Sequence, residues 1–212
     1  MRINKPQGEV AVAPDYTIEI VPYSDMYLSV RYGNSGEVQQ YRLRAGQKKD
    51  FTTTLTDTTN TQILIYPGSR IQALNDLSAC YVDYNDFSSA EKLKTLIIGS
   101  NVEGYENRFL TYLTLKNNTL LEKLDVRNCP NLTGSINLSS CPNLKEFYAE
   151  GTSITSALFA RNGKIEIAHL PETINNLTLL DLYYLDDLII PSYENLEEFV
   201  CEHSTVDELS IL

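Results

Sequence analysis

The sequence contains no tryptophan, only two histidines and only four cysteines among its 212 residues. The cysteines form no CxxC pair, and no HxxxH or HExxH pattern occurs, so the ligand spacings typical of zinc sites are missing. The GxxxxGK[ST], GxGxxG and GxSxG motifs are missing as well. Enzymatic chemistry needs a converging set of reactive groups. We therefore expect no catalytic residue, no metal site and no cofactor.

Basic residues are scarce, with 17 Lys and Arg against 28 Asp and Glu and a net charge of −11. This balance repels phosphate backbones, and no Lys/Arg-rich stretch interrupts it, which predicts no nucleic-acid binding. Long apolar runs are also missing. The N-terminal MRINKPQGEVAVAPDYTIEIV has no signal-peptide core, and no stretch approaches 18 apolar residues. The expectation is a soluble protein, made in a cytoplasm, with no membrane insertion.

A repeated leucine frame dominates the second half of the chain. In LLEKLDVRNCPNL, which covers residues 120–132, apolar residues follow the pattern L-x-x-L-x-L. The frame recurs about every 11 residues, and no window between turn signals shows the stripe of an amphipathic helix. Ten frames begin at Leu110, Leu121, Leu132, Leu144, Ile154, Ile165, Ile174, Leu185, Leu196 and Val206. The frame at Leu132 contains one inserted residue.

Eleven residues supply only one wall and one corner of a closed coil, because two walls must lie about 10 Å apart. Two successive frames are therefore predicted to form one coil of about 21–23 residues, in a mainly β solenoid with little helix. One wall is expected to be centred on Asp125, Tyr148, His169, Ile189 and Ser210. The opposite wall is expected to be centred on Thr114, Asn137, Leu158, Thr178 and Val200.

Small side chains that follow each strand are expected at the corners, where they can hydrogen-bond the turning backbone. These corner residues are Asn118, Cys129, Cys141, Thr152, Asn162, Thr173 and Ser204. Two of them are cysteines in matching CPNL words, so we expect buried free thiols that pack as small apolar side chains. The same expectation covers all four cysteines, Cys80, Cys129, Cys141 and Cys201.

The N-terminal third has a different pattern. Segments such as YTIEIV, MYLSVRY and TQILIYP alternate apolar and polar residues and are separated by turn words. We expect an extended arm over 1–14, a small antiparallel β module over 15–70, and the solenoid over 71–212, with an insertion at 100–109. The sequence ends on an apolar strand pair, so the array is expected to continue in a longer chain or to dock onto another subunit.

Several longer sequence segments resemble those of a known family. They are GYENRFLTYLTLKNN, LDVRNCPNL, CPNLKEFYAEGTSIT, HLPETINNLTL and IIPSYENLEEF. This segment resembles leucine-rich-repeat proteins, and within them large structural proteins from tailed bacteriophages of gut bacteria. Those proteins place such repeats after a β-rich segment like YLSVRYGNSGEVQQYRLRAG. The resemblance covers about residues 25–212. It implies a non-enzymatic virion component, in the tail or on the head, made in the host cytoplasm.

Acidic residues gather at the C-terminal end and leave two alternatives open. They are Asp186, Asp187, Glu197, Glu198, Glu202, Asp207 and Glu208. Glycosidase carboxylates or a calcium site are one interpretation. However, stacked coils place equivalent positions about 5 Å apart, so any acidic repeat position produces a ladder. A solvated acidic face is the simpler interpretation, and His169 and His203 are likewise expected to be surface residues without a catalytic part.

Outward residues of one wall mix charged, aromatic and apolar side chains, as protein interfaces do. This candidate interaction face comprises Asp125, Arg127, Glu146, Tyr148, Glu150, His169, Asp187 and Ile189. The expected partners are other virion proteins, further copies of the chain in one particle, or a host-surface receptor. A bacterial cell-surface adhesin or ligand-binding module is the second hypothesis, and a polysaccharide-degrading enzyme on a β-solenoid is a third.

Overall fold

The computed structural model describes residues 2–4, 15–32, 38–54, 62–66, 68–76, 87–99, 106–108, 110–192 and 194–211. Helix in these ranges is limited to the single turn η1 (Gly68–Arg70), and none is long and apolar enough to cross a membrane. The N-terminal strands are β1 (Arg2–Asn4), β2 (Asp15–Pro22), β3 (Met26–Tyr32), β4 (Val38–Leu43), β5 (Lys49–Thr54), β6 (Gln62–Tyr66) and β7 (Ile71–Asp76). The prediction of a mainly β chain with little helix is confirmed.

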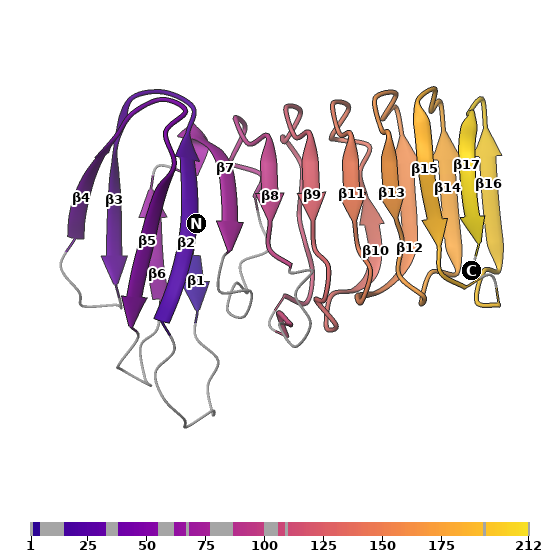
Figure 1. Ribbon diagram of the computed structural model, residues 1–212, viewed down its shortest axis with the longest axis horizontal. Coiled ribbons are helices and arrows are strands. Elements are labelled where there is room, and N and C mark those ends of the chain that lie inside the picture. The colour runs from indigo at the N-terminus through magenta and orange to yellow at the C-terminus, as the bar shows by residue number, and fades with distance from the viewer. Residues whose placement is uncertain are drawn as a thin grey trace.

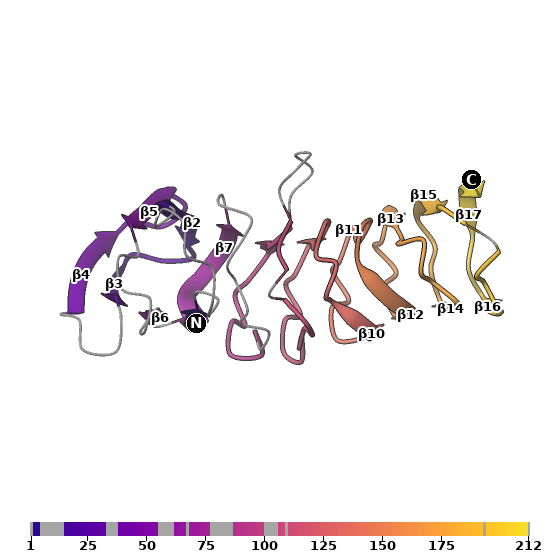
Figure 2. The same ribbon diagram turned by 90° about the horizontal axis from the view of Figure 1, so that it is seen from below.

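The later strands form two parallel walls that run along the molecule (Figure 1). The first wall contains β8 (Thr95–Ile97), β9 (Lys123–Asp125), β11 (Glu146–Tyr148), β13 (Ile167–His169), β15 (Leu185–Ile190) and β17 (Val206–Ile211). The second wall contains β10 (Thr133–Asn137), β12 (Ser153–Ala160), β14 (Asn176–Leu180) and β16 (Glu198–Glu202). Seen from below, they are two rows joined by corners (Figure 2). We call the first wall the odd wall, because its strands from β9 onward have odd numbers, and the second wall the even wall.

The registers of both walls match the prediction of two frames per coil, except that Thr114 lies in none of the even-wall strands. Asp125, Tyr148, His169, Ile189 and Ser210 are successive partners in the odd wall. Asn137, Leu158, Thr178 and Val200 are successive partners in the even wall. Along the odd wall the steps between partners after β9 are 23, 21, 20 and 21 residues. The step from Leu96 to Leu124 is 28 residues and includes the predicted insertion, most of which lies outside the described residues.

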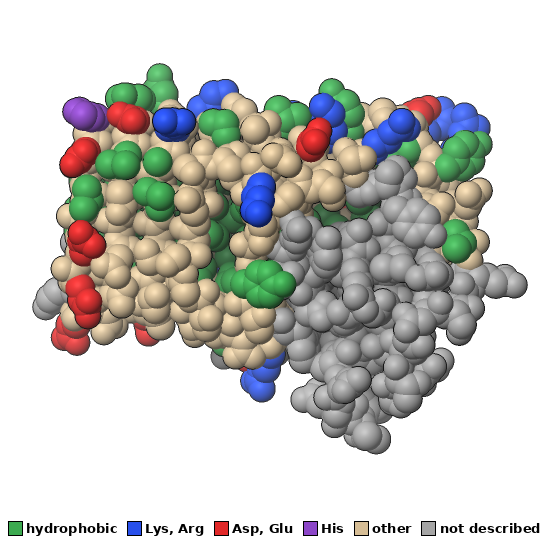
Figure 3. Space-filling model, turned by 180° about the vertical axis from the view of Figure 1, so that it is seen from behind, with side chains coloured by type: hydrophobic (Ala, Val, Ile, Leu, Met, Phe, Trp, Pro, Cys, Tyr) green, Lys and Arg blue, Asp and Glu red, His purple; other side chains and the backbone are tan. Residues whose placement is uncertain are grey.

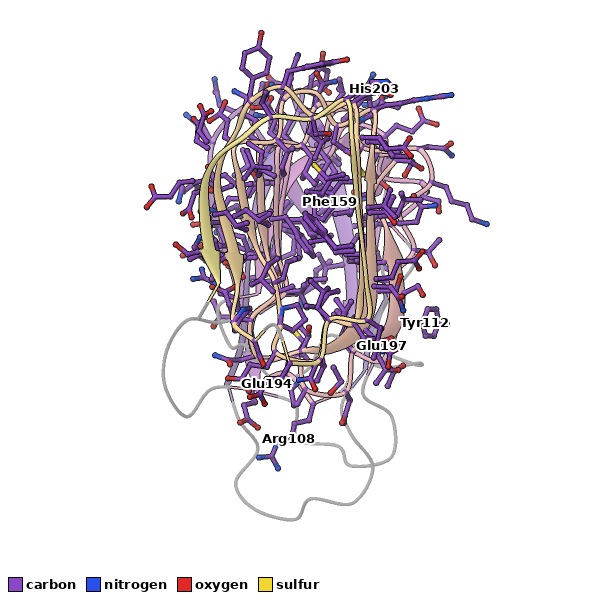
Figure 4. All side chains as sticks on the ribbon, turned by 90° about the vertical axis from the view of Figure 1, so that its right-hand side faces the viewer. Arg108, Tyr112, Phe159, Glu194, Glu197 and His203 are labelled. Carbon is purple, nitrogen blue, oxygen red and sulfur yellow. The ribbon has the colours of Figure 1, made fainter. Side chains whose placement is uncertain are left out.

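Aliphatic and aromatic side chains fill the space between the walls. Leu124, Phe147, Ala168 and Leu188 form one inward ladder and are at most 1% exposed. Phe159, on the even wall, lies between the two walls when the array is viewed from its end (Figure 4). Its ring makes an edge contact with Phe147, with centroids 5.6 Å apart. Burial of this ladder supplies the main stabilisation of each coil, at about 1.5–3 kcal/mol for each large side chain.

The extra residue in the Leu132 frame is absorbed by a β-bulge. The pairing between β10 and β12 shifts register between Gly134 and Ser135. Gly134 has φ of 79°, a left-handed conformation that costs glycine little. Ile136 and Leu138 thereby return to the interior, where both are buried. The irregular frame therefore keeps its inward side chains.

Corner side chains hydrogen-bond the backbone, as predicted, and several of them reach the preceding coil. The Asn118 amide donates to two carbonyls of the preceding coil at 3.0 Å, and Asn162 does the same at 2.8 and 2.7 Å. Thr173 Oγ1 donates to the Ile154 carbonyl at 2.7 Å. A second series, not predicted from the sequence, consists of Asn131, Asn143 and Asn195, whose amides donate to carbonyls 23 or 24 residues earlier. These bonds tie each corner to the one before it.

The N-terminal strands are continuous with the solenoid. β2 and β5 extend the odd wall, because β2 pairs antiparallel with β7 and β7 pairs parallel with β8. A second, four-stranded antiparallel sheet has the order β1-β6-β3-β4. Residues 2–4 of the predicted arm form β1 and pair with β6. The rest of the predicted arm lies outside the described residues, and the domain boundaries stay predictions.

The final coil departs from the buried pattern. Phe199 and Leu209 occupy inward positions but are 44% and 46% exposed, because no further coil covers them in the structure. Cys201, in the same coil, is exposed. The prediction of a buried thiol is therefore wrong for Cys201, whereas Cys129 and Cys141 are buried free thiols. Cys80 lies outside the described residues.

These positions predict selective thiol labelling. In a Cys80→Ser background, a thiol-reactive reagent should modify Cys201 in the folded protein and reach Cys129 and Cys141 after unfolding. Burial also raises the pKa of the Cys141 thiol to about 11, which keeps it protonated near neutral pH. Peptide mass spectrometry after a timed pulse provides the measurement. Equal labelling of the three thiols in the native state would contradict the burial of the corner cysteines.

Candidate interaction face

The predicted face residues lie together on the odd wall. Register places Lys123, Glu146, Ile167 and Asp187 in one column, and Asp125, Tyr148, His169 and Ile189 in the next. Arg127 follows β9, and Glu150 follows β11. Because each strand repeats the geometry of the previous one, side chains that are 20–23 residues apart become neighbours. The structure therefore brings all eight predicted residues onto adjacent strands or the turns that follow them.

A buried carboxylate lies at the base of this face. Asp125 was expected to point outward into solvent, but it is only 3% exposed. Arg127 Nε donates to Asp125 Oδ1 at 3.0 Å, and its Nη2 lies 2.5 Å from Oδ2. Arg127 also lies over the ring of Tyr148, 4.7 Å from the centroid, and Lys123 lies 4.9 Å from the same centroid. These longer side chains cover Asp125. The alternation of inward and outward residues along the strand places Asp125 outward and does not predict this burial.

Two side chains of this cluster, Arg127 and Tyr148, have raised pKa values. The hydrogen bond to Asp125 raises the pKa of Arg127 above its ordinary value. Burial, and next the negative charge of Glu146, raise the pKa of Tyr148 to about 12. The Tyr148 hydroxyl donates to Glu146 Oε2 at 3.2 Å. Tyr148 therefore remains a neutral hydrogen-bond donor across the whole physiological pH range.

The raised pKa of Tyr148 predicts a loss of stability in alkali. The unfolded tyrosine titrates near pH 10 and the folded one near pH 12, so between these values the folded state keeps a proton that the unfolded state has released. Its contribution to stability is complete below pH 10 and falls as the pH rises towards 12. Urea unfolding at a series of pH values should show a shallower alkaline decline for Tyr148→Phe. The same slope in both proteins would contradict this assignment.

His169 joins three neighbouring side chains. Its Nδ1 lies 3.0 Å from Glu150 Oε1, and its Nε2 lies 3.0 Å from Asp187 Oδ2. Its ring also makes an edge contact with Tyr148, with centroids 5.1 Å apart. His169 is thus a half-buried residue that connects β11, β13 and β15. These contacts hold the side chains of the face in one arrangement.

A pocket of about 460 Å³ opens beside this network, where β11, β13 and β15 end. It is lined by Glu150, Gly151, Thr152, Glu172, Thr173, Ile189 and Pro191. Glu150 and Ile189 belong to the predicted face, whereas the other lining residues were not predicted from the sequence. The signal that could have found them is the repeat itself, because the turns after β11 and β13 stack directly on one another.

The acidic residues of the last coils lie mainly at the surface. Asp186, Glu197, Glu198, Glu202, Asp207 and Glu208 are exposed. Asp187 is half-buried and bound to His169. No group of three His, Cys, Asp or Glu side chains within the described ranges is arranged to hold a metal ion. His203 is also exposed, with its Nδ1 3.7 Å from Asp181 Oδ1.

The even wall offers a contrasting surface. Its outward positions on three strands carry no charge: Ser135, Asn137, Ser156, Leu158, Ala160, Asn176, Thr178 and Leu180. The space-filling view from behind shows this wall with few charged side chains until its C-terminal edge, where acidic groups appear (Figure 3). Ion pairs, cation–ring contacts and an edge contact between rings thus distinguish the odd wall from the even wall.

Comparisons with known proteins give no relatives. No family model, no curated protein and no solved structure matches this chain. What the chain does must therefore be inferred from its own surface.

Proposed function

We propose that this chain is a non-enzymatic structural protein of a tailed-phage virion, and that its odd wall binds a partner protein or the host surface. The proposal combines the resemblance of the repeat words with the architecture of the face. The observation that carries the binding role is the network of Asp125, Arg127, Tyr148, Glu150 and His169. It contains the Asp125–Arg127 ion pair, and neighbouring strands are joined by the His169–Glu150 contact and by ring contacts.

Such a network suits recognition for physical reasons. Arg and Tyr are the side chains that most often carry binding energy in protein interfaces. Here they are held by other protein groups, so a partner need not immobilise them on binding. The solenoid backbone adds rigidity, because each inner coil is hydrogen-bonded to the coils on both sides. Outward residues can then change without disturbing the buried ladder.

The proposal is tested on particles of a phage that encodes this chain. Mass spectrometry of purified virions should detect the chain at a constant ratio to the other particle proteins. Particles that carry Tyr148→Ala with His169→Ala should retain less of the chain or adsorb to the host less, because the face loses its central ring contacts. The matched control is Thr178→Ala on the even wall, which should behave like wild type.

Each purified variant is first compared with wild type by thermal melting, so that misfolding is not mistaken for lost binding. Absence of the chain from virions would contradict the structural role. Its recovery in the envelope fraction of a bacterium would instead support the alternative, a cell-surface adhesin. Normal incorporation and normal adsorption of the double variant would contradict the assignment of the odd wall.

A further inference from the structure

The net negative charge of the chain is concentrated in its C-terminal third. Residues 1–145 contain 15 acidic and 15 basic residues, whereas residues 146–212 contain 13 acidic and two basic residues. The whole net charge of −11 therefore belongs to the coils that begin at β11. Such a field attracts a basic partner over distances of about a Debye length, and it repels acidic ones.

The pocket beside His169 lies within this acidic C-terminal third. Glu150 and Glu172 contribute carboxylates to its lining, Thr152 and Thr173 contribute hydroxyl-bearing side chains, and Ile189 and Pro191 contribute apolar surface. No basic side chain is among the lining residues. Glu172 is exposed and forms none of the ion pairs seen among the described residues.

Glu150 has unused hydrogen-bonding capacity. Its Oε1 is bound by His169, but its Oε2 is buried and has no hydrogen-bond partner among the described residues. A buried carboxylate oxygen without a donor is unfavourable, and a positive charge placed nearby offsets part of that cost. The pocket thus combines an under-satisfied carboxylate, an exposed carboxylate and an apolar wall.

We propose that this pocket receives the cationic side chain of a basic partner protein, with arginine as the best fit. The aliphatic stem of the arginine packs against Ile189 and Pro191. Its planar guanidinium donates to the Glu172 carboxylate and places its charge beside Glu150. This proposal rests on the proposed binding role of the odd wall. It deepens that role by naming the chemistry of the partner.

Other occupants fit the pocket less well. A divalent cation prefers several oxygen ligands at about 2.0–2.6 Å, and the described residues hold no cluster of three metal-binding side chains. An apolar side chain would bury the Glu172 carboxylate and leave Glu150 Oε2 without a donor, which is unfavourable. An acidic group would meet the repulsion of the surrounding field. Charge complementarity therefore favours an arginine.

The experiment uses the isolated full chain and a small probe, so that its failure is separate from failure of the virion assignment. The chain is labelled with ¹⁵N and titrated with N-acetyl-arginine amide, and the amide resonances of Gly151, Thr152 and Thr173 are followed. N-acetyl-citrulline amide, of nearly the same shape but uncharged, is the control ligand. Glu172→Gln is the test variant, and Glu198→Gln, an exposed acid on the even wall, is the matched control.

We expect the arginine probe to shift these resonances and the citrulline probe to leave them unchanged. Glu172→Gln should weaken binding about tenfold, since a charge-assisted hydrogen bond is lost. Glu198→Gln should bind like wild type. Equal shifts with both probes, no shifts with either, shifts unaffected by Glu172→Gln, or shifts produced by calcium chloride alone would each overturn the proposal.

Discussion

Replacement of Phe147 by alanine should lower the free energy of unfolding by about 3–5 kcal/mol. Phe147 is fully buried, lies between Leu124 and Ala168 in the inward ladder, and packs edge-on against Phe159. The substitution removes a ring from the middle of the array, where the coils on both sides limit the collapse of the resulting cavity. Chemical denaturation followed by circular dichroism measures the change.

Phe199 provides a matched control for this substitution. It occupies the corresponding inward position of the last even-wall strand, but it is 44% exposed. Phe199→Ala should therefore cost about 1 kcal/mol or less, because little apolar surface returns to water. Equal losses for the two variants would contradict the difference in burial between the central and final coils.

Replacement of Asn162 by alanine should cost about 1–3 kcal/mol. The Asn162 amide is buried and donates to the carbonyls of Leu138 and Cys141 in the preceding coil, at 2.8 and 2.7 Å. Alanine cannot make either bond, and it leaves a small space at the corner. The shift of the denaturant midpoint between the variant and wild type, at an unchanged m-value, measures this loss.

The control for Asn162 is Asn195, whose amide donates to the Glu172 carbonyl at 2.9 Å from an exposed position. Water can replace that bond, so Asn195→Ala should change stability by less than about 0.5 kcal/mol. If Asn162→Ala melted like wild type, the buried corner amides would not stabilise the fold. The contacts that stabilise one coil against the next would then come from the sheets alone.

Much of the fold could be predicted because the repeat determines which residues stack. The spacing of Leu124, Phe147 and Ala168 is about twice the frame length, and the need for two walls requires two frames in each coil. Corner roles could also be predicted, because Asn162 and Thr173 follow their strands at regular intervals and are short enough to reach the backbone. The inserted residue near Gly134 could be found by counting.

Features that depend on long side chains or on the third dimension could not be predicted in the same way. Asp125 points away from the interior, yet Arg127 and Tyr148 cover it. The pocket forms where the turns after β11 and β13 stack beside the end of β15. The sequence around Glu172 does not by itself indicate that this residue lines such a pocket. Cys201 fits the frame, but its place in the last coil leaves it exposed.

The stacking of two frames per coil is tested most directly by one distance. Lys123 and Glu208 occupy the same column of the odd wall, four strand steps apart. Spin labels at these positions, in a cysteine-free background, should be separated by about 19 Å, because each step is about 4.8 Å. If every frame made its own coil, eight steps would separate the labels by about 38 Å. Pulsed electron paramagnetic resonance should give the shorter distance, and a distribution centred on the longer one would contradict the solenoid described above.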